Sequence, residues 1–180
     1  MTHAKTLADT LTATRFLIAI WMLWMGTTAG APALPSITIG LVIAWMTDLV
    51  DGPLARRDPM RRHSWLGDHD LQVDMAVALS LLLYLTVSRF VPARVTLSYL
   101  ALCALLLWRF RARALGMLLQ APVYGWTLYV ALRNIPRYGF LMIGWILFTI
   151  IVTWPRFPLM VVPEFLQGMR DLWGEAKEEQ

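Results

Sequence analysis

Acidic residues are missing from about half of the chain: none lies between Asp74 and Glu164 in a sequence of 180 residues. The chain is also poor in cysteine. Cys103 is the only one, which excludes an intramolecular disulfide, and its place within an apolar run indicates a packing role. Charged residues make up 16% of the chain and hydrophobic residues 58%, a balance that ordinary soluble proteins do not have. The composition therefore predicts an integral membrane protein, and the lack of a soluble basic domain argues against nucleic acid as a partner.

Several apolar runs are long enough to cross a bilayer, which takes roughly 20 residues of helix. Six of them begin near Thr12, Pro35, Leu66, Val95, Ala114 and Tyr138. With six spans, twelve of the 16 basic residues fall on one side of the membrane, and loops rich in Lys and Arg stay in the cytoplasm. The pattern predicts an all-α polytopic membrane domain over 1–160, with six transmembrane helices and both termini cytoplasmic. The expected location is the plasma membrane, which in bacteria is the inner membrane.

The chain changes character after Pro163. Apolar residues recur there at helical spacing, and a charged end follows: Phe165, Leu166, Met169, Leu172 and Trp173. A helix with one apolar side and a charged end is typical of a segment that lies on a membrane surface. The sequence therefore predicts a short amphipathic helix in a cytoplasmic tail over 161–180.

The acidic residues that the middle of the chain lacks are concentrated just before it. Half of the twelve lie from Asp48 to Asp74, at the edges of the second and third predicted spans. Asp48 and Asp51 are three positions apart and Asp70 and Asp74 are four apart, so each pair occupies one helical face. Ionised groups at that depth must face the bundle interior, a partner or an ion. Because carboxylate oxygens are hard ligands that suit Mg²⁺ or Mn²⁺, we expect the two pairs to share one ion site.

The residues that follow Asp51 favour a phosphorylated ligand. Gly52 and Pro53 are expected to interrupt the helix, and Gly52 and Ala55 leave room for a ligand close to the backbone. Arg56 then supplies a guanidinium group that matches phosphate geometry. Acidic residues that hold a metal, small residues that make room and a nearby arginine together favour a diphosphate substrate.

These residues resemble the signature of the CDP-alcohol phosphotransferases, D-x2-D-G-x2-A-R followed by G-x3-D-x3-D. The matching residues are Asp48, Asp51, Gly52, Ala55, Arg56, Asp70 and Asp74. The motif's second glycine stands at Gly67, one position later than in the pattern. The start of the first span, Leu11 and Thr12 with Arg15, also looks like that of the family. The resemblance covers the first three spans by motif and the others by span count alone.

The resemblance implies an enzyme of phospholipid synthesis. An alcohol such as glycerol 3-phosphate would attack the phosphorus of a CDP-alcohol, with CDP-diacylglycerol the expected donor, and CMP would leave. The implied ligands of two Mg²⁺ or Mn²⁺ ions are Asp48, Asp51, Asp70 and Asp74. The implied general base is Asp74, and the implied lining of the CDP pocket is Gly52, Ala55 and Arg56. Members of the family are commonly homodimers, so a homodimer is the assembly that the resemblance implies.

The sequence leaves several alternatives open. It does not separate glycerol 3-phosphate from inositol phosphate, serine or phosphatidylglycerol as the acceptor. A transporter that uses intramembrane carboxylates as an ion or proton path is the competing class, although the four signature aspartates cluster on one side. Thr12 and Arg15 fit either a headgroup contact or a helix cap and an interfacial charge. The arginines at 109, 111 and 113 fit either an acceptor phosphate or the membrane topology alone.

Overall fold

The computed structural model of the chain describes residues 3–56, 69–110 and 113–155, together with 159, 162–163, 166–168 and 170. Within these ranges the fold is all-helical and no strand occurs, which confirms the predicted fold class. The long helices are α1 (His3–Thr28), α2 (Leu34–Arg56), α4 (Asp70–Val87), α5 (Ala93–Arg109), α6 (Arg113–Asn134) and α7 (Pro136–Thr153). A short 3-10 helix, η1 (Ala31–Ala33), turns the chain from α1 into α2.

Four of these helices are candidate membrane spans by their length and composition. Within the described part of the chain, four segments combine the length and the hydropathy of a membrane span: Ala31–Val50, Asp70–Val87, Leu115–Asn134 and Pro136–Thr153. They belong to α2, α4, α6 and α7, with η1 leading into the first. The helices α1 and α5 are not among them, so the count of six spans stays a prediction.

The predicted starts of the second, fourth, fifth and sixth spans lie within two residues of observed helix starts. The third, near Leu66, lies outside the described residues, and the first differs. The helix α1 begins at His3, well before Thr12. Hydropathy marks only the apolar part of a helix, whereas good helix formers such as Ala4 and Leu7 extend it into the polar N-terminal segment. The first helix is consequently the longest, at 26 residues.

The expected break at Gly52 and Pro53 is wrong. The helix α2 continues through both residues and ends at Arg56. A proline removes one backbone hydrogen bond, but a helix that is already formed propagates more readily than it nucleates. Prolines are also tolerated in membrane helices because neighbouring groups satisfy the freed carbonyl. The carboxylate end of α2 is therefore one uninterrupted helix.

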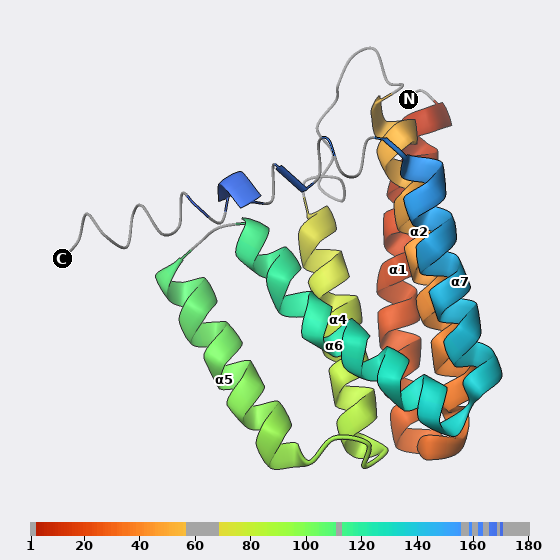
Figure 1. Cartoon of the computed structure of the whole chain (residues 1–180), viewed down its shortest axis with the longest axis vertical. Helices are drawn as coiled ribbons and strands as arrows, with labels where there is room; N and C mark the ends of the chain where they lie inside the picture. The colour runs from red at the N-terminus through yellow and green to blue at the C-terminus, as the bar shows by residue number, and fades with distance from the viewer. Residues whose placement is uncertain are drawn as a thin grey trace.

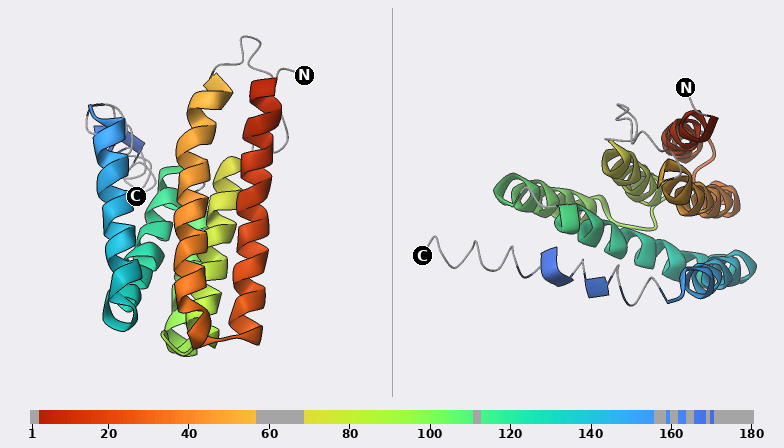
Figure 2. Two further views of the ribbon diagram at one scale, coloured as in Figure 1. Left: turned by 90° about the vertical axis from the view of Figure 1, so that its right-hand side faces the viewer. Right: turned by 90° about the horizontal axis from the view of Figure 1, so that it is seen from above.

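Figures 1 and 2 show α1, α2 and α4 side by side as an upright bundle, with α7 next to α2 and α6 crossing in front of α4 in the view of Figure 1. The interior of this bundle is formed by large apolar side chains with no exposed surface, such as Met22, Ile37 and Leu81. The helices α1 and α4 approach closely at Gly26, where an added Cβ would lie 3.3 Å from the ring of Tyr84. Close packing of these three helices fixes the ends of α2 and α4 beside α1.

The helices α6 and α7 form a hairpin through Ile135. Gly139 of α7 lies against the backbone of Leu132 in α6, and an added Cβ would stand 2.8 Å from the Cα atom of Leu132. Only a glycine allows the two backbones to come so close. The predicted amphipathic helix over 161–180 falls mostly outside the described residues, so it stays a prediction.

Candidate functional site

The aspartates of α2 and α4 meet on one arginine of α1. The guanidinium of Arg15 donates a hydrogen bond of 2.9 Å from Nη1 to Oδ1 of Asp48. It also forms ion pairs with Oδ1 of Asp74 through Nη1 and with Oδ1 of Asp70 through Nη2. The three carboxylates approach so closely that one oxygen from each lies within 4.8 Å of the others. Three helices thus contribute to one charged cluster, which we call the carboxylate cluster: Arg15, Asp48, Asp70 and Asp74.

Exposure rises from the arginine outward. The side chain of Arg15 is 1% exposed, that of Asp74 27%, that of Asp70 42% and that of Asp48 51%. The arginine therefore forms the floor of the cluster, and the carboxylates form its open side. A ligand that arrives from solvent meets the carboxylates first.

Local structure explains why the carboxylates lie where they do. Asp70 is in the first turn of α4, where the positive end of the helix dipole stabilises a negative charge. Asp74 follows one turn later on the same face. Asp48 lies near the end of α2, and because α1 packs against both helices, Arg15 projects between them. The predicted meeting of Asp48, Asp70 and Asp74 at one place is what the structure shows.

The roles considered for Thr12 and Arg15 need correction. Neither a helix cap nor an interfacial charge describes them, because both lie inside α1 and are 3% and 1% exposed. The Nη2 atom of Arg15 also donates to Oγ1 of Thr12 at 3.4 Å. A signal for this was present in the sequence, since an arginine next to an apolar run needs a partner of opposite charge. The partners, however, are 33 to 59 positions away along the chain.

A second layer of side chains surrounds the carboxylate cluster. Tyr124 of α6 lies close enough to Asp48 and Asp74 for their charges to act on its hydroxyl group. Its ring packs edge-on against Trp45 of α2, with centroids 5.4 Å apart. The hydroxyl donates to Oε1 of Gln120 at 3.1 Å. The aromatic pair therefore places α6 beside the cluster, a contribution that the sequence did not indicate.

The remaining residues of the signature lie on the last turns of α2. Asp51, Gly52, Ala55 and Arg56 are helical in backbone, and their side chains are outside the described part of the structure. Within a continuous helix, Asp51, Gly52 and Ala55 stand three, four and seven positions after Asp48, a spacing that repeats on one face. The backbone thus carries these positions outward from Asp48 along one side of α2.

The arginines considered for an acceptor phosphate are not brought to the carboxylate cluster by any described contact. Arg109 is at the end of α5, where its guanidinium lies 4.9 Å from the ring centroid of Phe110. Arg111 and the side chain of Arg113 fall outside the described residues. Their proposed role in binding the acceptor therefore stays a prediction.

The donor set of the carboxylate cluster fits a hard divalent cation. Arg15 engages Oδ1 of each aspartate, and a carboxylate has a second oxygen with which to bind an ion. When ionised, the three aspartates exceed the single positive charge of Arg15 by two. Such an excess beside apolar helices requires further positive charge, which one divalent cation would supply. Asp48, Asp70 and Asp74 are the residues that could hold it.

Comparison with known proteins adds no family to this geometry. No protein-family model, no curated protein and no solved structure matches the chain.

Proposed function

We propose that the protein is a metal-dependent CDP-alcohol phosphotransferase that transfers a phosphatidyl group from CDP-diacylglycerol to an alcohol, with release of CMP. One observation carries the proposal: aspartates from two different helices meet at the open side of a buried arginine, and when ionised they exceed its charge by two. A nucleoside diphosphate is itself anionic. It can approach such a cluster only when cations neutralise both, which is the arrangement that the resemblance to this family implies.

The metal ions would be Mg²⁺ or Mn²⁺, held by Asp48, Asp70 and Asp74, with Asp51 as the further ligand that the motif implies. When bound, they supply positive charge that stabilises the diphosphate and the oxygen on which CMP leaves. The part of Arg15 is structural and electrostatic. It fixes one oxygen of each carboxylate, so that the other oxygens are held in place before an ion binds.

Asp74 is the proposed general base. It is the least exposed of the three carboxylates and lies one turn inside α4, where water has least access. In the proposed step, the Asp74 carboxylate accepts the proton of the acceptor hydroxyl group while that oxygen forms a bond to phosphorus. The bond between phosphorus and the CMP oxygen breaks, and CMP leaves with the electron pair.

The nucleotide would lie along the last turns of α2. Gly52 and Ala55 carry no bulky side chain, and Arg56 supplies a cation for phosphate. We further infer that this end of the bundle faces the cytoplasm, because most of the basic residues lie on that side. A cysteine introduced at Met60, in a Cys103→Ser background, should react only with reagents added to the cytoplasmic side. Reaction from the opposite side alone would contradict the proposed orientation.

The test of the function is direct. The purified protein, given CDP-diacylglycerol, Mg²⁺ and a panel of acceptors that includes glycerol 3-phosphate, inositol phosphate, serine and phosphatidylglycerol, should release CMP with one of them. Asp70→Asn should abolish CMP release, whereas Asp171→Asn, the same change in the C-terminal tail, should leave it unchanged. If the protein released no CMP with any acceptor but carried ions across liposome membranes, the proposed enzyme function would be wrong and a transporter would be indicated.

A further inference from the structure

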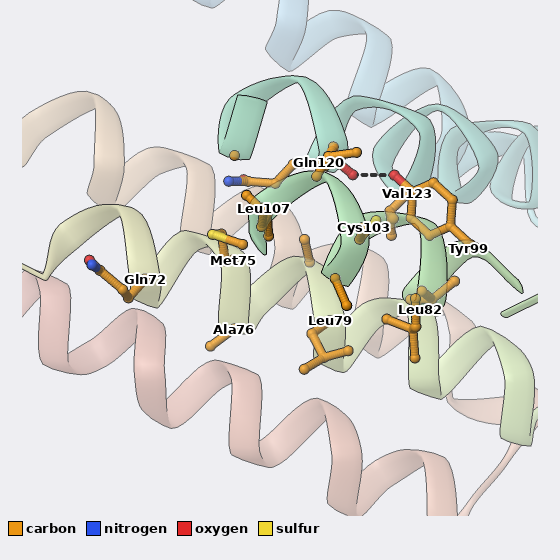
Figure 3. Close-up of a pocket in the computed structure, with 15 residues that line it drawn as sticks. Gln72, Met75, Ala76, Leu79, Leu82, Tyr99, Cys103, Leu107, Gln120 and Val123 are labelled. Atoms are coloured by element: carbon orange, nitrogen blue, oxygen red, sulfur yellow. Dashed lines mark hydrogen bonds between the residues drawn. The ribbon is translucent and has the colours of Figure 1, made fainter. Parts of the chain in front are cut away.

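A cavity lies on the other side of α4 from the carboxylate cluster. Figure 3 shows the residues that line it, which come from α4, α5 and α6. Its volume is about 460 Å³. A second cavity of about 240 Å³ adjoins it, and the two share Leu82, Tyr99 and Val123. Together they form one path along α4, which we call the interhelical cavity. The larger part alone is in the size range of sites that bind small ligands.

The lining of the interhelical cavity is almost entirely hydrocarbon. No charged side chain lines it, and its polar groups are few. The hydroxyl of Tyr99 donates to the backbone carbonyl of Leu119, and the amide of Gln120 accepts from Tyr124 at 3.1 Å. Apolar cavities of this kind do not retain water, because a buried water needs two to four polar partners. The cavity is therefore suited to an apolar occupant.

The helix α5 closes the cavity only loosely. Among the described residues of α5, Thr96 is the only buried one, and its hydroxyl lies 2.6 Å from that of Thr86 in α4. Side chains facing outward from α5, such as Leu102 and Leu105, are about half exposed. Side chains that line an empty cavity have no atoms to contact on that side, so they lose dispersion energy along the whole lining. In a bilayer, lipids surround the protein, so an acyl chain is the group available to fill the cavity.

The dimensions of the interhelical cavity agree with one acyl chain. Its lining on α4 runs from Gln72 to Leu85, which spans about 20 Å at the rise of an α-helix. The hydrocarbon core of a bilayer is roughly 30 Å thick, so an acyl chain of this length fits within it. The polar end of the lining is at Gln72, in the first turn of α4, and in a span that runs over the whole of α4 this end is nearest to the lipid headgroups. Amide groups at that level match the ester carbonyl groups of a glycerolipid.

This cavity is distinct from the carboxylate cluster. Gln72 stands two positions from both Asp70 and Asp74, so it points to the opposite face of α4. The two sites are nevertheless connected, because Gln120 lines the cavity and binds the hydroxyl of Tyr124 beside the cluster. An occupant of the cavity would hold α6, and with it Tyr124, in a fixed position.

We propose that the interhelical cavity binds one acyl chain of a bilayer glycerophospholipid, with its ester end at Gln72 and Gln120 and its methyl end toward Val95. This lipid is a resident of the protein and not the substrate at the carboxylate cluster. A test of this proposal therefore does not depend on the transferase activity.

The experiment uses the full chain in nanodiscs that contain phosphatidylglycerol with a photoreactive diazirine in the middle of one acyl chain. After illumination, peptide mass spectrometry should find the label on residues of the lining, such as Leu79 and Cys103. Ala104→Phe places a ring in the cavity and should lower this labelling about tenfold, which corresponds to about 1.4 kcal/mol of binding. The matched control is Ala101→Phe, the same change on the same helix at a position outside the lining, and it should leave labelling unchanged.

Three results would overturn the proposal. Equal labelling in wild type and Ala104→Phe would show that the chain lies elsewhere. Label spread evenly over Leu102, Leu105 and the lining would indicate unspecific contact with bulk lipid. Efficient disulfide cross-linking of two chains through Cys103 would show that a second copy of the chain fills the cavity.

Two variants with smaller changes in side-chain volume test the proposal in case Ala104→Phe does not fold. Gly116→Ala adds one methyl group in ordinary contact with Leu71 and Met75, at 3.4 to 3.6 Å, and should reduce labelling modestly. Gly125→Ala is on the same helix with no atom within 4 Å of the added group, so labelling should persist. If Gly116→Ala also leaves labelling unchanged while Ala104→Phe fails to fold, the acyl chain does not occupy this cavity.

Discussion

The bundle of α1, α2 and α4 and the outer helix α5 contain similar apolar side chains but use them differently. In the bundle, residues such as Met22, Leu41 and Leu85 have no exposed surface. In α5, Leu97 is 67% and Trp108 is 74% exposed. Both regions are helical and rich in leucine, so apolar composition does not determine which helix packs against protein. The difference lies in charge: the bundle holds Arg15 and the aspartates that pair with it, and these groups must lie away from hydrocarbon.

The carboxylate cluster therefore determines how the bundle packs, in addition to forming the proposed reaction site. Helices in lipid gain little from the hydrophobic effect on association, so polar contacts and close packing decide which of them pair. The ion pairs of Arg15 join α1 to α2 and to α4, while the outer helices pack through uncharged contacts such as those of Gly139 and Thr96. Changes in the bundle should therefore cost more than changes in the outer helices.

The largest effect is expected from Arg15→Met. It leaves three carboxylates without their shared cation, and breaking a buried ion pair costs about 3–5 kcal/mol, here toward the lower end because the aspartates are partly exposed. CMP release should fall about 100-fold or more, equivalent to about 2.7 kcal/mol or more, and the melting temperature in detergent should drop. Arg94→Met, at the exposed start of α5, is the control and should change neither. If Arg15→Met were as stable as the wild type, the conclusion that these ion pairs stabilise the bundle more than the contacts of the outer helices do would be wrong.

Binding of Mn²⁺ should come next. If the ion binds the cluster, a concentration 100 times its dissociation constant stabilises the folded state by about 2.7 kcal/mol, or roughly 5 °C or more in melting temperature. Differential scanning fluorimetry with Mn²⁺ and with a chelator measures the shift without any assay of activity. Asp48→Asn should abolish the shift. An equal shift in that variant would place the ion elsewhere.

A smaller effect is expected at the hairpin of α6 and α7. Gly139→Ala drives a methyl group into the backbone of Leu132, and overpacking of this kind costs about 1–3 kcal/mol. Gly144→Ala makes the same change in the same helix with no atom within 4 Å of the added group, and should be neutral or slightly stabilising. Melting curves of the two variants measure the difference. Equal curves would mean that the two backbones separate easily.

The smallest effect is expected from Thr96→Val in α5. The change removes the hydroxyl that meets Thr86, and contacts of this kind between membrane helices average about 0.6 kcal/mol. Thr86 keeps its bond of 2.7 Å to the carbonyl of Leu82, so no buried hydroxyl is stranded. The melting temperature should fall by little, and CMP release should not change. A loss comparable to that of Arg15→Met would contradict the division between the bundle and the outer helices.

The fold class and much of the site were predictable from the sequence for local reasons. Apolar runs separated by turn residues predict helices, because a backbone in lipid must satisfy its own hydrogen bonds. The spacing of Asp70 and Asp74 predicts a shared face, and both lie in the first turns of α4. The end of α2 was harder to locate, because the local preference of Gly52 and Pro53 for a break was overridden by the helix that precedes them.

The sequence by itself determined an all-helical chain with membrane-spanning segments and two pairs of aspartates at helix ends, because these features depend on neighbours along the chain. Only the tertiary structure decided that Arg15 lies beneath three of these aspartates, that Tyr124 lies near them, and that a cavity remains on the other side of α4. These features depend on the packing of α1 and α6 against α4. Residues 33 to 59 positions apart carry no signal of their proximity in one sequence, because it is the geometry of helix packing that brings their charges together.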